Sequence, residues 1–157
     1  MMTTPIIMLA LMMLPWTVTL AWYRARRQPL DGSRSAVIGL TLLFVFTGIG
    51  HFVQTMPMVQ MLPPWVPQRE ALVYASGLLE FAIAIGFLFT RTRRTTGWLA
   101  VAVLIGFFPL NIYAAIHHVP MGGHAWGPAY LLIRAPLQIA IVMWIICFIL
   151  RRSRIYQ

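Results

Sequence analysis

Five long apolar runs constrain the fold of this chain more than any other feature. They cover about residues 5–23, 35–57, 71–90, 95–117 and 128–150. A helix needs about 20 apolar residues to cross the hydrocarbon core of a bilayer, and a soluble domain would not contain such runs repeatedly. The connections between the runs are short. The sequence therefore predicts an all-α membrane protein with five transmembrane helices and no separate soluble domain.

The positive charge of the chain predicts its orientation. The net charge is +9, and all twelve basic residues are arginines. With five spans, three arginine clusters lie on one side of the membrane, and Arg69 beside Glu70 lies on the other. The positive-inside rule then places the N-terminus outside and the C-terminus in the cytoplasm. The clusters are Arg24, Arg26, Arg27 and Arg34; Arg91, Arg93 and Arg94; and Arg151, Arg152 and Arg154.

This distribution also bears on partners. The charge is accounted for by topology and by attraction to anionic lipid, so we do not expect nucleic-acid binding. The first apolar run is longer than the core of a signal peptide, and its positive charges follow it, which predicts a retained anchor. Cys147 is the single cysteine, so dithiol–disulfide chemistry within the chain is excluded.

Four polar residues interrupt four of the apolar runs: His51, Glu80, Asn111 and Arg134. A charged side chain at the centre of a membrane helix costs roughly 2.5–3.5 kcal/mol on insertion scales, so such groups usually face a partner or a cavity. At 1.5 Å per residue, three of them lie about 9 Å from the outer end of their helices, and Glu80 lies about 15 Å from it. We therefore expect the four to meet in the outer half of the bundle.

Each of these residues has a structural and a functional interpretation. Glu80 and Arg134 form either a buried ion pair that holds the bundle together, or a site in which Arg134 binds an anionic or carbonyl oxygen while Glu80 exchanges protons. His51 is either a hydrogen-bonded core histidine or a proton donor to a quinone carbonyl. For Asn111, interhelical hydrogen bonding is the favoured role, with ligand binding as the alternative.

The surroundings of the four residues extend the predicted site. Gln138 is four residues after Arg134 and shares its helix face. The stretch 63–67, which contains Trp65, is stiff and aromatic, and we expect it to lie in the interface or to fold over the site as a lid. Small residues at Gly48, Gly77 and Gly86 are expected to permit close helix approach.

Three further histidines, His117, His118 and His124, raise the alternative of a metal or b-type haem site. Adjacent histidines point to different helix faces, and the spacing matches no standard site. We therefore predict no metal ligands, and we interpret these histidines as an interfacial polar edge.

Several ordered motifs resemble the DoxX-like family of small bacterial membrane proteins. The resemblance covers about residues 39–148 and implies a four-helix core. In this chain the core with its short basic tail would span residues 35–157, preceded by an N-terminal helix and basic loop in residues 1–34. The motifs are Gly50-His51-Phe52, Pro63-Pro64-Trp65-Val66-Pro67, Tyr74-Ala75-Ser76-Gly77-Leu78-Leu79-Glu80, Arg91-Thr92-Arg93-Arg94, Phe108-Pro109-Leu110-Asn111-Ile112-Tyr113 and Arg134-Ala135-Pro136-Leu137-Gln138.

The resemblance also implies a range of functions. The family takes its name from the membrane subunit of a thiosulfate:quinone oxidoreductase, and relatives belong to redox or assembly systems. Some redox relatives carry cysteine pairs, which this chain lacks. The resulting hypothesis is a quinone-linked redox subunit of the bacterial cytoplasmic membrane. Glu80, His51 and Arg134 would be catalytic, and Asn111, Gln138 and Trp65 would bind the ligand.

Cofactor and partner expectations follow from this hypothesis. Quinone is the expected ligand, and a bound haem or flavin is the less favoured source of electrons. A membrane or periplasmic protein, or a second copy of the chain, would be the partner. The alternatives are a non-catalytic assembly or structural subunit and a small-molecule carrier; no inverted repeat supports the carrier.

Overall fold

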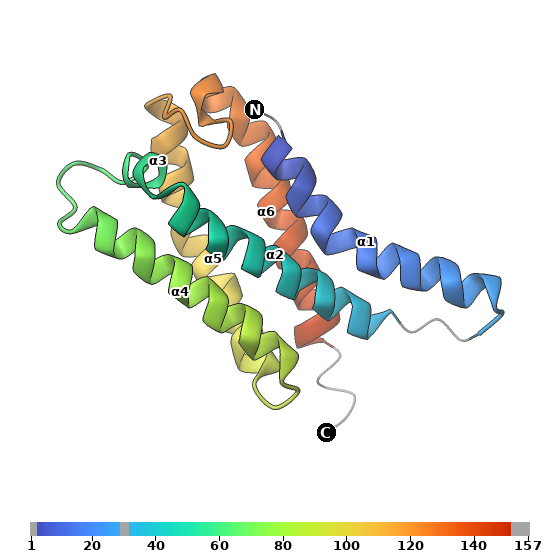
Figure 1. Ribbon diagram of the computed structural model, residues 1–157. Coiled ribbons are helices and arrows are strands. Elements are labelled where there is room, and N and C mark those ends of the chain that lie inside the picture. The colour runs from blue at the N-terminus through green and yellow to red at the C-terminus, as the bar shows by residue number, and fades with distance from the viewer. Residues whose placement is uncertain (1–2, 29–31, 152–157) are drawn as a thin grey trace.

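A computed structural model describes residues 3–28 and 32–151 and shows an all-helical chain in the part described (Figure 1). The long helices are α1 (Thr3–Ala25), α2 (Ser33–Val53), α4 (Arg69–Leu88), α5 (Arg93–Ile116) and α6 (Leu131–Ile145). Shorter elements are α3 (Thr55–Val59), the 3₁₀ segment η1 (His124–Tyr130) and the π-helical turn η2 (Ile146–Leu150).

Within the described residues, five helical segments are long and apolar enough to cross a membrane. Four of them are α1, α2, α4 and α5, and the fifth is the continuous stretch His124–Leu150, which joins η1, α6 and η2. This confirms the prediction of an all-α chain with five helices of membrane-spanning length and composition. Pro109 and Pro136 lie inside α5 and α6, and both helices continue through them.

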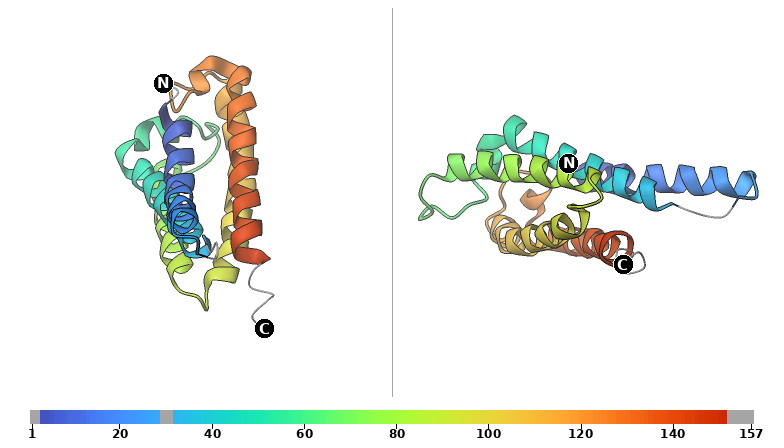
Figure 2. Two further views of the ribbon diagram at one scale, coloured as in Figure 1. Left: turned by 90° about the vertical axis from the view of Figure 1, so that its right-hand side faces the viewer. Right: turned by 90° about the horizontal axis from the view of Figure 1, so that it is seen from below.

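The helices form two layers. Seen along the bundle, α4, α2 and α1 lie side by side in one layer, and α5 and α6 form the other (Figure 2). The core between them is apolar and includes Phe44, Phe87 and Ile141, all at most 1% exposed. Met8 and Met12 of α1 belong to the same core, and the N-terminal helix packs directly on α2 and α6.

Glycines set the closest helix contacts, as the sequence predicts. A Cβ on Gly48 would meet the ring of Phe81, and one on Gly86 would overlap the side chain of Thr96. These contacts bring α2 against α4 and α4 against α5. Gly39 plays the same role between α2 and α1, since a Cβ there would overlap the backbone of Met12.

One helix end differs from its prediction. The second helix was expected to run to Pro57, but α2 ends at Val53 and the chain turns at Gln54 before α3. Pro57 has no N–H, so it cannot bond to the carbonyl one turn earlier and the helix loses its continuation. The Thr55 hydroxyl donates instead to the His51 carbonyl oxygen at 2.7 Å.

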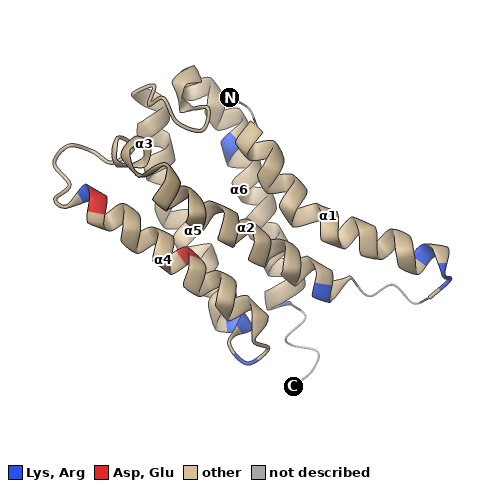
Figure 3. Ribbon diagram, viewed as in Figure 1, with Lys and Arg blue, Asp and Glu red and all other residues tan. Residues whose placement is uncertain are grey.

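The arginine clusters gather at one end of the bundle (Figure 3). This end contains the end of α1 at Arg24, the start of α2 at Arg34, the turn at Arg91–Arg94 and the end of η2 at Arg151. The opposite end contains Arg69 and Glu70, where α4 begins. Arg152 and Arg154 of the predicted third cluster lie outside the described residues. The charge asymmetry expected from the sequence is therefore present in the fold.

Candidate functional site

The site begins with a close crossing of α2 and α4. At Gly77 a Cβ would lie 2.7 Å from the His51 Cβ and 3.3 Å from the Gly48 carbonyl oxygen. Real side chains do not approach this closely, so the absence of a side chain at Gly77 lets His51 reach across to α4. The crossing therefore holds the imidazole against the helix that carries Ser76 and Glu80.

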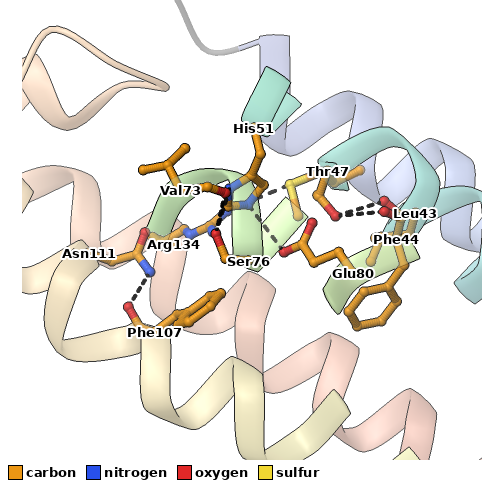
Figure 4. Close-up of polar contacts among 11 residues, drawn as sticks. Leu43, Phe44, Thr47, His51, Val73, Ser76, Glu80, Phe107, Asn111 and Arg134 are labelled. Atoms are coloured by element: carbon orange, nitrogen blue, oxygen red, sulfur yellow. Dashed lines mark hydrogen bonds and ion pairs between the residues drawn. The ribbon is translucent and has the colours of Figure 1, made fainter. Parts of the chain in front are cut away.

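His51 uses both ring nitrogens at this crossing (Figure 4). Its Nδ1 lies 2.9 Å from the Ser76 hydroxyl and 3.1 Å from the Val73 carbonyl oxygen. Its Nε2 lies 3.6 Å from Glu80 Oε1. The Ser76 hydroxyl has one proton and lies 2.8 Å from the Val73 carbonyl oxygen as well. If it donates to Val73, the N–H of Nδ1 donates to the Ser76 or the Val73 oxygen; if it donates to a bare Nδ1, Nε2 carries the imidazole proton and points it toward Glu80. His51 thus connects Ser76 with Glu80.

Glu80 is buried and incompletely paired. The residue is 8% exposed, and its second oxygen, Oε2, has no hydrogen-bond partner among the described residues. A buried polar atom without a partner is destabilising by about 1–3 kcal/mol, and such atoms in native proteins call for an explanation. Oε2 is enclosed by protein atoms, so a group that enters the site would reach it once neighbouring side chains shift.

One interpretation of the sequence required an ion pair between Glu80 and Arg134, and the structure does not contain this pair. No ion pair within 4.0 Å joins them in the described part of the chain. Arg134 instead donates from Nη1 to the Met8 sulfur at 3.6 Å, because α1 packs against α6 on this side. Its Nε is buried and has no acceptor. The guanidinium therefore has one N–H without an acceptor and forms no ion pair with the Glu80 carboxylate.

A cavity of about 300 Å³, here called the polar cavity, connects these groups. His51, Glu80, Asn111 and Arg134 all line it, so the four polar residues expected to converge meet at one place. Its lining comes from both layers, at the ends of α2 and α5 and the starts of α1 and α6, which are the helix ends away from the arginine clusters. Ligand sites commonly have volumes of about 300–1,000 Å³ and a few convergent polar groups. The further lining residues are Thr4, Met8, Phe46, Thr47, Ile49, Gly50, Val53, Gln54, Met58, Phe107, Met121, Gly122, His124 and Tyr130.

Asn111 keeps part of its side chain within its own helix. Its Nδ2 donates to the Phe107 carbonyl oxygen at 2.9 Å, one turn earlier in α5. The residue is 5% exposed and lines the polar cavity. The bond differs from the interhelical contact favoured by the sequence interpretation, because the side chain turns back along α5 instead of reaching another helix.

Two predicted ligand-binding residues lie elsewhere. Gln138 does not line the polar cavity; it donates from Nε2 to the Leu104 carbonyl oxygen at 2.9 Å and so ties α6 to α5. Trp65 is 81% exposed and lines neither this cavity nor its neighbour. The loop of residues 63–67 extends past the start of α4 and does not cover the polar cavity, so the structure shows no lid there (Figure 1). The other expectation, that this loop lies in the membrane interface, stays a prediction.

His124 joins the site although the sequence placed it at a polar edge. It is 4% exposed, lines the polar cavity, and its Nε2 has no partner. Gly123, with a φ of 111°, turns the chain so that His124 folds inward, where its ring lies 4.8 Å from that of Tyr130. The signal was the Gly122-Gly123 pair, which permits the left-handed turn that brings this histidine back to the bundle.

The other two histidines remain at the surface. His117 Nδ1 lies 2.8 Å from the Tyr113 carbonyl oxygen, and His118 Nδ1 lies 3.2 Å from that of Ala125. Among the described residues, no group of three His, Cys, Asp or Glu side chains is arranged to hold a metal ion. The polar groups of the residues that line the polar cavity are one carboxyl, two imidazoles, two amides, one guanidinium and the hydroxyls of two threonines and a tyrosine.

Comparison with known proteins places the chain in a family. The family model described as "Domain of unknown function (DUF8561)" matches residues 40–149, which is more than half of the chain, so the protein belongs to this family. The matched range includes all of α4, α5 and α6 and most of α2, and leaves out α1. No curated protein and no solved structure matches the chain.

Proposed function

We propose that this protein is the quinone-binding subunit of a redox assembly in the bacterial cytoplasmic membrane, with the quinone headgroup in the polar cavity. One observation carries the proposal. Three buried polar atoms without partners, Glu80 Oε2, His124 Nε2 and Arg134 Nε, belong to residues that line the same cavity. Three such atoms around one cavity indicate a polar guest that satisfies them. The DoxX-like motifs in residues 39–148 favour a quinone as that guest.

A quinone headgroup matches the groups that surround the cavity. It has two carbonyl oxygens on opposite sides of a flat ring, and both require donors as they become hydroxyls. Arg134 Nε is a donor without an acceptor among the described residues, and His51 and His124 are the two imidazoles that line the cavity. Phe107 and Tyr130 supply apolar and aromatic wall area for the ring.

The proton chemistry rests on the contact of His51 with Glu80. Reduction of a quinone to a quinol takes up two electrons and two protons. Glu80 and His51 would deliver the protons to the two oxygens. Their separation of 3.6 Å exceeds a direct hydrogen bond, so proton exchange between them would pass through one bridging water. Arg134 would stabilise the negative charge that develops on an oxygen before protonation. The electrons would come from a flavin- or haem-carrying partner protein.

The proposed orientation puts the polar cavity near the outer surface. The arginine-rich end of the bundle would face the cytoplasm, with the N-terminus outside and the C-terminus inside. The partner would then meet the protein from the periplasmic side or within the membrane.

The alternative is a non-catalytic assembly subunit whose polar core only fixes the bundle. The internal bonds of His51 to Ser76 and Val73 favour it, since they lock α2 to α4 without any ligand. Under this alternative the polar cavity holds water, and a neutral Glu80 variant changes stability alone.

Glu80→Gln separates the two, with Glu70→Gln as the matched control. Glu70 lies on the same helix but is exposed and lines neither cavity. Each protein is purified gently from its native membrane, its absorbance spectrum is recorded, and bound small molecules are extracted for mass spectrometry. We expect about one quinone per chain in the wild type and in Glu70→Gln, and its loss in Glu80→Gln. A wild type without quinone would favour the assembly subunit.

A further inference from the structure

A second cavity lies directly beside the first. It measures about 370 Å³, is formed by α4, α5 and the segment from α3 to Leu62, and is here called the apolar cavity. Apart from His51 and Ser76, every residue that lines it is apolar. Leu72, on its rim, is 46% exposed, and Ala75 is exposed as well. Because both lie on the flank of a membrane-spanning helix, this cavity opens sideways toward the bilayer.

The two cavities share a wall. His51, Met58 and Phe107 line both of them. The imidazole stands between the two, since its Nδ1 faces Ser76 and Val73 of the apolar cavity and its Nε2 faces Glu80 of the polar cavity. Met58 is an unbranched side chain that can move aside at little cost. A molecule with a polar head and an apolar tail would fit across this wall.

We infer that the apolar cavity holds the hydrocarbon tail of the quinone whose headgroup occupies the polar cavity, and that the quinone enters sideways from the bilayer between α4 and α5. This inference rests on the proposed function and specifies its substrate as a long-tailed quinone. The apolar cavity adjoins the polar cavity, which favours a quinone tail over the acyl chain of a bulk lipid. A bulk lipid in the apolar cavity would make no contact with the polar groups behind His51. Burial of apolar tail surface adds affinity that the headgroup alone cannot supply.

Filling the apolar cavity tests the inference. Ala75→Phe places a ring in it, and Ala82→Phe is the control, since Ala82 is exposed on the same helix and lines neither cavity. Binding of decylubiquinone and of the tail-less ubiquinone-0 is measured by equilibrium dialysis with the protein in lipid nanodiscs. We expect Ala75→Phe to weaken decylubiquinone about tenfold, as loss of two buried methylene groups would. Ubiquinone-0 should bind unchanged, and the control should alter neither affinity.

Other outcomes overturn the inference. Equal losses for both quinones would mean that the ring disturbs the headgroup site, and unchanged binding of both would place the tail elsewhere. Release of co-purified phospholipid by Ala75→Phe, with both quinones unaffected, would identify the apolar cavity as a lipid site. Failure of the wild type to bind either quinone would overturn the proposed function itself. The effects of Ala75→Phe bear only on where the tail lies, so the two failures are distinguishable.

Discussion

Substitution of Gly77 by alanine tests the crossing on which the site is built. The added Cβ would lie 2.7 Å from the His51 Cβ and 2.8 Å from Phe52 Cε2, whereas ordinary contacts begin at 3.4 Å. Both neighbours are close to the backbone or held in a ring stack, so α2 and α4 must separate. Overpacking of this kind costs about 1–3 kcal/mol. The same shift would pull His51 away from Ser76 and Glu80.

Gly106→Ala is the matched control for this prediction. Gly106 also lies inside a membrane-spanning helix, but a Cβ there meets nothing within 4 Å. Glycine in a helix interior is about 0.5–1 kcal/mol less favourable than alanine, so the control should be slightly stabilised.

Unfolding in mixed micelles, followed by the fluorescence of the six tryptophans, measures both variants. Gly77→Ala should unfold at a lower denaturant concentration than the wild type and should also bind quinone more weakly. If Gly77→Ala is as stable as Gly106→Ala, the crossing is looser than the structure shows and the reasoning fails.

Three further predictions concern single side chains. Glu80→Gln should lose quinone while its free energy of unfolding stays within about 1 kcal/mol of the wild type, because the carboxyl leaves one oxygen unpaired; denaturant titration beside ligand extraction checks this. Asn111→Ala should cost about 0.5–1.5 kcal/mol for the lost bond to Phe107, measured by the same titration; a loss far above this would mean a wider structural role. Trp65→Ala should leave quinone affinity unchanged in equilibrium dialysis, since the side chain is exposed and lines neither cavity; weaker binding would restore the lid.

The membrane-spanning helices were predictable because hydrocarbon requires long apolar runs with internally bonded backbones. Depth along each helix was predictable as well, since it depends only on helical rise. This is why His51, Glu80, Asn111 and Arg134 could be expected to meet in the outer half of the bundle.

The pairings within that level were not predictable. Glu80 faces His51 rather than Arg134, because the absence of a side chain at Gly77 brings α2 against α4. Arg134 turns toward Met8 of α1, a contact set by how the N-terminal helix packs. Partner choice in a bundle depends on distances between helices, which the spacing of residues in one helix does not encode.

His124 shows a different limit. Its place in the site depends on a loop that folds back through left-handed backbone at Gly122 and Gly123. The glycines signal that such a turn is permitted, but not where it leads. The same holds for residues 63–67, where prolines and Trp65 suggested a cover and the loop extends outward instead.

Photoaffinity labelling with an azidoquinone in the native membrane tests the central claim, that the polar cavity is a quinone site, most directly. Peptide mapping would locate the attached label, and excess unlabelled quinone would show whether the labelling is specific. The account predicts competed label within the segments 46–58 and 107–111, which contain many of the residues that line the polar cavity. Label that excess quinone does not reduce, or that falls only on residues outside both cavities, would contradict it.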